Sequence, residues 1–131
     1  MKPLLTVLAA FLIPVLALAA DEAPKDGPVK IEVAEKQIAS GIQLLDVRTV
    51  DEWETGYLKG AKRATFGEKD FLAQAKAAAD PKKPVLVYCR SGKRTVKAAK
   101  ELRDAGFTSV LEMEGGLIEW EKAGKPLVKG K

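Results

Sequence analysis

The only cysteine of the chain, Cys89, stands where an apolar run ends and a cationic run begins. From this residue the sequence reads Cys89, Arg90, Ser91, Gly92, Lys93, Arg94, Thr95. The apolar run 85–88 predicts a buried strand, and apolar residues three and four positions apart after the cationic run predict a helix that ends at Gly106. Cys89 is therefore expected in a loop between the carboxyl end of a strand and a helix N-terminus, a common ligand site in α/β sheets.

The surroundings of Cys89 favour a thiolate over a thiol. Loop N–H groups can point inward, the helix contributes the positive end of its dipole, and three cationic side chains follow. A free cysteine titrates near ~8.5, and such surroundings lower its pKa to roughly 3.5–7.5. An inert core cysteine is the alternative, since lone cysteines are often buried. We predict that Cys89 is a nucleophile and that an anionic substrate is bound by Arg90, Ser91, Gly92, Lys93, Arg94 and Thr95.

Residues 89–95 resemble the active-site loop of the rhodanese sulfurtransferases, whose cysteine carries sulfur as a persulfide. Two further stretches match in the right order. The upstream one contains Asp46, Val47, Arg48, Glu52, Trp53 and residues 56–61, and the closing one contains Gly115, Gly116, Leu117 and Trp120. The resemblance covers residues 29–126 and implies an α/β fold, a rhodanese-like three-layer domain with a mostly parallel central sheet flanked by helices. Tyr57 stands where a histidine is common in the family.

The resemblance implies transfer of sulfane sulfur from thiosulfate, through a Cys89 persulfide, to cyanide or a thiol acceptor. This cycle needs an ionised cysteine but no histidine base, and the chain has no histidine. A cysteine protease or acyltransferase would lack its proton acceptor. Two alternatives are a noncatalytic module that uses the domain as a scaffold, and a cysteine phosphatase, which needs an arginine where Thr95 stands. No cofactor is expected, and one cysteine without histidine predicts no zinc site.

Apolar periodicity also predicts the elements around the loop. Strands are expected over 29–33, 43–47, 62–66 and 109–113, and helices over 34–39, 67–79 and 117–123, with a short helix after Arg48. Alternation of strands and helices predicts a parallel sheet with helices on both faces. Asp46, Arg48 and Glu52 are expected to form a structural salt-bridge network. The two tryptophans are expected to be core residues or hydrophobic lids.

The N-terminus has the pattern of a signal peptide. A basic start is followed by the apolar run 4–18, and small residues end it at Ala17 and Ala19. We predict a signal peptide over 1–19, a linker over 20–28, the domain over 29–126 and a C-terminal tail over 127–131. A membrane anchor is the alternative, but the run is short for the ~20 residues of a spanning helix. The protein is thus expected to be periplasmic or secreted, without stable membrane association after cleavage, and it resembles the periplasmic phage-shock-type rhodaneses.

The net charge and the number of cysteines limit the classes of binding partner that can be expected. The formal net charge is +4, and basic residues alternate with acidic ones, so nucleic-acid binding is not expected. A single cysteine excludes an internal disulfide. The expected partners are a small anionic sulfur donor, thiosulfate, and a thiol or cyanide acceptor, while the sequence does not predict an oligomeric state.

Overall fold

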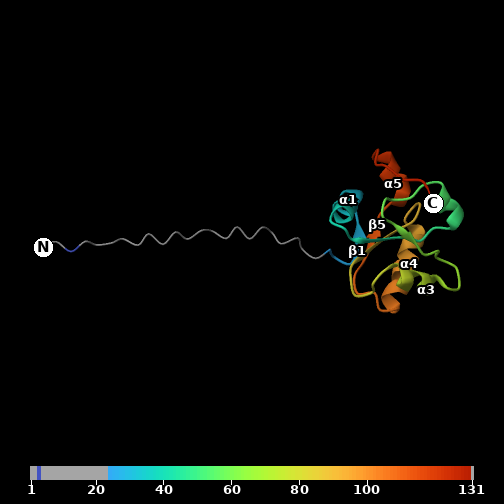
Figure 1. Cartoon of the computed structure of the whole chain (residues 1–131), viewed down its shortest axis with the longest axis horizontal. Coiled ribbons are helices and arrows are strands. Elements are labelled where there is room, and N and C mark those ends of the chain that lie inside the picture. The colour runs from blue at the N-terminus through green and yellow to red at the C-terminus, as the bar shows by residue number, and fades with distance from the viewer. Residues whose placement is uncertain (1–2, 4–23, 131) are drawn as a thin grey trace.

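The computed structural model describes Pro3 and residues 24–130, and they contain one five-stranded sheet (Figure 1). The strand order is β1-β5-β4-β2-β3, and every pairing is parallel. The strands are β1 (Gly27–Val29), β2 (Gln43–Asp46), β3 (Lys62–Arg63), β4 (Val85–Tyr88) and β5 (Val110–Met113). Except for Pro3, the predicted signal peptide 1–19 lies outside the described residues.

Helices cover both faces of the sheet, as the sequence predicts. They are α1 (Ile31–Ala39), α2 (Val50–Glu54), α3 (Phe71–Ala78), α4 (Lys93–Asp104) and α5 (Gly116–Lys122). Figure 1 shows α1 and α5 on one side and α3 and α4 on the other. Two core clusters match these layers, one with side chains of α3 and α4 and the other with side chains of α1 and α5. None of the helices in the described part of the chain is long and apolar enough to cross a bilayer.

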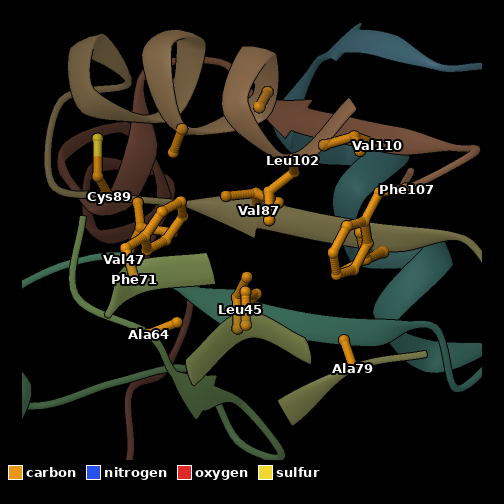
Figure 2. Packing of buried hydrophobic residues seen from close by; sticks show 14 residues of the cluster. Leu45, Val47, Ala64, Phe71, Ala79, Val87, Cys89, Leu102, Phe107 and Val110 are labelled. Atoms are coloured by element: carbon orange, nitrogen blue, oxygen red, sulfur yellow. The ribbon is translucent and has the colours of Figure 1, made fainter. Parts of the chain in front are cut away.

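The central strand β4 determines on which face the cysteine lies. All of its residues are buried, as expected for a strand covered on both sides. Because side chains alternate along a strand, Val85 and Val87 pack toward α3 and α4, and Leu86 and Tyr88 pack toward α1 and α5. The Cys89 side chain points to the same face as Val85 and Val87. Figure 2 shows it at the end of this cluster nearest the start of α4.

The strand predicted over 29–33 is wrong except at its first residue. β1 ends at Val29, and α1 begins at Ile31. Ile31 and Ala34 are both buried against the second core cluster, and this three-residue spacing is that of one helix face. A run of only five alternating residues fits either period, so tertiary burial decides between helix and strand. The linker predicted over 20–28 also overlaps β1, which begins at Gly27.

Three other predicted boundaries shift. β3 is much shorter than the strand predicted over 62–66, and α3 begins at Phe71 instead of residue 67. Gly67 has a φ of +98° and so belongs to a turn. The tail predicted over 127–131 begins with residues that contact the domain, since Tyr57 and Val128 exchange two backbone hydrogen bonds of 2.9 Å.

Candidate active site

Cys89 lies directly after β4, and residues 90–92 form a tight loop before α4 begins at Lys93. Gly92 caps this helix with a φ of +94°, in the left-handed region. A Cβ at this position would also lie 3.2 Å from the backbone nitrogen of Gly115. Because Gly92 has no side chain, it leaves the first N–H groups of α4 without a side-chain cap. Those N–H groups are free to face the thiol.

The Cys89 thiol is buried and held by N–H groups of the loop. Its Sγ accepts a hydrogen bond of 3.0 Å from the N–H of Gly92, and the residue has 0% of its surface exposed. Burial raises the pKa of the thiol, whereas the Thr95 hydroxyl and the N–H groups of Thr95, Gly92 and Ser91 lower it. The lowering contributions prevail, so the pKa of Cys89 lies below its ordinary value. The site therefore favours the nucleophilic form.

Thr95 occupies the first turn of α4 next to this thiol. The residue is 1% exposed. Its hydroxyl is a buried side-chain oxygen that makes no hydrogen bond of regular geometry with the described residues. It nevertheless contributes more than any single N–H group to the lowered pKa of Cys89. The hydroxyl is thus available to the cysteine sulfur, or to an atom bound to that sulfur.

The carbonyl groups of the loop point away from the thiol, toward the start of α5. The N–H of Leu117 donates to the carbonyl oxygen of Cys89 at 3.1 Å, and the N–H of Ile118 donates to that of Arg90 at 3.0 Å. Gly116 permits this approach, because a Cβ there would lie 2.5 Å from both oxygens. With its carbonyls bound on one side, the loop directs N–H groups to the other side, where Sγ lies. Gly115 and Gly116 are predicted as a tight turn and belong to the family resemblance, but spacing does not predict this contact.

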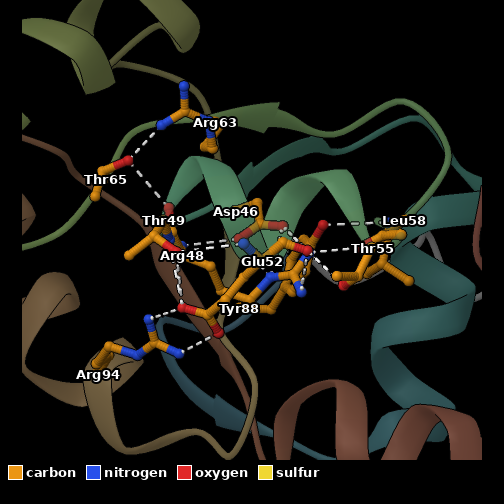
Figure 3. A network of polar contacts seen from close by, with 11 residues as sticks. Asp46, Arg48, Thr49, Glu52, Thr55, Leu58, Arg63, Thr65, Tyr88 and Arg94 are labelled. Carbon is orange, nitrogen blue, oxygen red and sulfur yellow. Dashed lines mark hydrogen bonds and ion pairs between the residues drawn. The ribbon is translucent and has the colours of Figure 1, made fainter. Parts of the chain in front are cut away.

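The three loop cations have different environments. Arg94 forms a two-pronged ion pair with Glu52, with Nη1–Oε1 and Nη2–Oε2 distances of 2.6 and 2.8 Å (Figure 3). Hydrogen bonding from Arg94 holds the pKa of Glu52 at about 2. Arg90 and Lys93 are exposed and make no ion pair with any residue in the described ranges. The main groups that lower the pKa of Cys89 are the Thr95 hydroxyl and the loop N–H groups, while Arg94 also interacts electrostatically with Cys89.

The predicted salt-bridge network is present, but Glu52 has a different partner in it. Arg48 pairs with Asp46, with an Nη2–Oδ2 distance of 2.7 Å, and both side chains are at most 2% exposed. The same Nη2 donates to the carbonyl oxygen of Gly56 at 2.6 Å. Arg48 reaches only the backbone oxygen of Glu52, at 3.3 Å, so the Glu52 carboxylate is free to bind Arg94. The buried pair positions α2, and α2 positions the partner of the loop arginine.

A family model described as a rhodanese-like domain matches residues 30–123. The chain belongs to this rhodanese-like family. It is 33% identical to "Thiosulfate sulfurtransferase 16, chloroplastic" from Arabidopsis thaliana, over 82% of this chain and 97% of the relative. The solved polysulfide-sulfur transferase homodimer from Wolinella succinogenes is 32% identical, with a TM-score of 0.65 over 81% of this chain and 80% of that chain. A rhodanese-like domain from Anabaena is 26% identical, with a TM-score of 0.69 over 79% of each chain.

Family membership confirms the resemblance and the fold class inferred from the sequence. The departure at Tyr57 is accommodated by local packing in this rhodanese-like chain. The Tyr57 ring stacks on Trp53, with centroids 3.8 Å apart and ring planes 3° apart. Trp120 is 5% exposed and packs in the core. Both tryptophans thus have packing partners within the domain.

Proposed function

We propose that this rhodanese-like protein is a sulfurtransferase that moves sulfane sulfur from thiosulfate through a persulfide on Cys89. The observation that carries the proposal is a buried thiol with a lowered pKa, surrounded by inward N–H groups and the Thr95 hydroxyl at the start of α4. The names of two relatives support it. One is called a thiosulfate sulfurtransferase, and the other is described as a polysulfide-sulfur transferase.

The first half of the reaction adds a sulfur atom to Cys89 and forms the persulfide. The Cys89 thiolate attacks the outer sulfur of thiosulfate, a new S–S bond forms, the old one breaks, and sulfite leaves with the electron pair. The persulfide then carries the negative charge that the thiolate carried before. The N–H groups and hydroxyl that favour the thiolate also suit this anion, since they point to the same place. No proton acceptor is required, which fits a chain without histidine.

The second half of the reaction transfers the sulfur from Cys89 to the acceptor. Cyanide or a thiolate attacks the outer sulfur of the persulfide, and Cys89 leaves as a thiolate, so the site returns to its starting state. No oxidant or reductant enters either step. Of the loop cations, Arg90 and Lys93 have no ion-pair partner among residues 24–130 and can attract the dianionic donor, whereas the charge of Arg94 is matched by Glu52. We assign donor attraction to Arg90 and Lys93 on this basis.

The alternative functions predict different outcomes in one experiment. The purified protein is incubated with thiosulfate and cyanide, and thiocyanate formation is measured beside a Cys89→Ser control. We expect turnover by the natural protein, none by the control, and a mass increase of one sulfur atom on Cys89 after thiosulfate alone. Hydrolysis of aryl phosphates is expected to be absent, because Thr95 replaces the arginine of a phosphatase loop. A folded protein that forms neither thiocyanate nor the persulfide would be a noncatalytic module.

A further inference from the structure

A cavity of about 290 Å³ adjoins the cysteine loop on the side of β1 and β5. Its loop wall consists of Ser91, Gly92 and Lys93, and the remaining wall includes Val96, Met113 and Glu114. This volume is near the lower end of the ~300–1,000 Å³ of small-molecule sites. The cavity therefore suits a small metabolite-sized molecule, and not a protein segment.

The cavity and the thiol are separated by one residue. Gly92 lines the cavity, and its N–H is the group that donates to Sγ of Cys89 at 3.0 Å. Because Gly92 has no side chain, only its backbone separates the cavity from the thiol at this point. A reactive group at the end of the cavity that borders Gly92 is therefore one residue away from the sulfur of Cys89.

The walls of this cavity carry charges of opposite sign. Lys93 at the start of α4 and Glu114 after β5 are both exposed, and neither forms an ion pair within residues 24–130. The other acidic residue of the wall, Glu112, is bound by Arg103 at 2.8 Å. The wall also contains apolar surface, including Val96, which is 59% exposed. A ligand with one positive and one negative group and a short apolar chain matches this set of residues.

We propose that this cavity binds the sulfur acceptor, and that the acceptor is a small zwitterionic thiol. Its carboxylate pairs with Lys93, its ammonium pairs with Glu114, and its apolar carbons rest on Val96. The thiolate of the acceptor attacks the outer sulfur of the Cys89 persulfide. One S–S bond forms on the acceptor, the S–S bond to Cys89 breaks, and Cys89 leaves as a thiolate, so the electrons balance without a co-reactant. This inference rests on the proposed sulfurtransferase function.

The test compares four small thiols as acceptors with thiosulfate as the donor. L-cysteine has both charged groups, cysteamine has only the ammonium, 3-mercaptopropionate has only the carboxylate, and 2-mercaptoethanol has neither. The variant is Glu114→Gln, and the matched control is Glu121→Gln, an exposed glutamate on the following helix. The KM of each thiol is compared between proteins, so that differences in thiol reactivity cancel.

Glu114→Gln is expected to raise the KM of L-cysteine and cysteamine about twofold to fivefold, as expected for the loss of an exposed ion pair. The KM of the other two thiols and of cyanide is expected to stay unchanged, and Glu121→Gln is expected to change none. Val96→Trp, which fills the cavity from an exposed helix position, is expected to raise the KM of all four thiols. Equal KM values for L-cysteine in the natural protein and in Glu114→Gln would overturn the acceptor site.

The two proposals fail in different ways. If thiocyanate forms from thiosulfate and cyanide but Glu114→Gln does not discriminate among the thiols, the acceptor site is wrong and the sulfurtransferase proposal stands. If the natural protein forms neither thiocyanate nor a persulfide, the sulfurtransferase proposal is wrong, and the acceptor site falls with it.

Discussion

Cys89 combines two properties that usually oppose each other, full burial and a lowered thiol pKa. Burial removes water and disfavours the anion. Here the hydroxyl of Thr95 and the N–H groups of the loop replace that water and do more than offset its loss. Since the groups are fixed by the loop and the first turn of α4, the thiolate needs no rearrangement to be stabilised. The reactivity of this cysteine is thus expected to depend on positioned dipoles more than on net charge.

The role of Thr95 can be isolated by Thr95→Val, which replaces the hydroxyl with a methyl group of similar size. The pKa of Cys89 is expected to rise, because the hydroxyl lowers it. The measurement is the rate of alkylation by iodoacetamide as a function of pH. Thr95→Ser keeps the hydroxyl and is expected to keep the natural profile. At a pH where Cys89 is protonated, stability should not fall, since the hydroxyl has no regular hydrogen bond to lose among the described residues. An unchanged profile in Thr95→Val would contradict this role.

The ion pair of Glu52 and Arg94 makes a prediction about stability and pH. Both side chains are about one-third exposed or less, 28% and 34%, so Glu52→Gln is expected to cost no more than about 1 kcal/mol. The folded pKa of Glu52 is lowered from 4.5 to about 2. Its stabilisation is therefore complete above the unfolded value and is lost as the pH falls toward 2.

Urea unfolding of the natural protein and Glu52→Gln over this pH range measures that loss. Glu54→Gln is the matched control, an exposed glutamate of the same helix α2. The difference in free energy of unfolding between the natural protein and Glu52→Gln should shrink between pH 4.5 and 2, while Glu54→Gln should show no such trend. A difference that stays constant with pH would mean that the carboxylate charge of Glu52 contributes nothing.

At the scale of elements, the active loop is held by two helices from opposite layers. The first turn of α4 supplies the Thr95 N–H and hydroxyl to the sulfur, beside the loop N–H groups of Ser91 and Gly92, and α5 binds the carbonyl oxygens of Cys89 and Arg90 through its first N–H groups. Each helix N-terminus thus binds electron-rich atoms, as its dipole favours. Because α5 binds the carbonyl oxygens of Cys89 and Arg90, the loop cannot turn these two carbonyls toward the thiol without losing those bonds.

Gly116→Ala tests this contact. Its Cβ would lie 2.5 Å from the carbonyl oxygens of Cys89 and Arg90, so the loop must move or α5 must withdraw. Gly124→Ala is the matched control, because its φ of +74° is also left-handed but a Cβ there meets nothing within 4 Å. Both variants incur left-handed strain of about 1–2 kcal/mol. Only Gly116→Ala is expected to lose sulfurtransferase activity and to raise the pKa of Cys89, and equal activity in the two variants would contradict the contact.

The sequence predicted those elements whose local pattern admits one interpretation. β4 and the loop after it were correct, because a short apolar strand followed by glycine and cations has few alternatives. Residues 31–33 lie in α1 and not in the predicted strand, since their alternation also fits one turn of helix. The pairing of Arg94 with Glu52 joins positions 42 residues apart in the chain. No local pattern records such contacts, and neither the α5 contact nor the cavity at Glu114 could be read from spacing.

At the scale of the whole molecule, the segment before β1 is joined to the sheet at Asp26. Its carboxylate accepts a hydrogen bond of 2.8 Å from the N–H of Val110 and lies 3.0 Å from Nε of Arg103. These contacts fix the chain immediately before Gly27, where β1 begins. The predicted cleavage after Ala19 would therefore leave the edge strand and its anchor in place. The domain is expected to fold without residues 1–19.

This leads to a prediction about export and stability together. Protein recovered from the cell envelope is expected to begin at Ala20 or within a residue or two, as judged by N-terminal sequencing, and a retained Met1 would indicate a membrane anchor.

A chain that starts at Ala20 and carries Asp26→Asn should be about 1 kcal/mol less stable to urea than the same chain with Asp26, because a partly exposed ion pair is lost while the amide oxygen keeps an acceptor for Val110. Asp51→Asn, an exposed aspartate in the first turn of α2, serves as the control. Equal stability of the Asp26→Asn chain and its parent would mean that the sheet edge holds without this anchor.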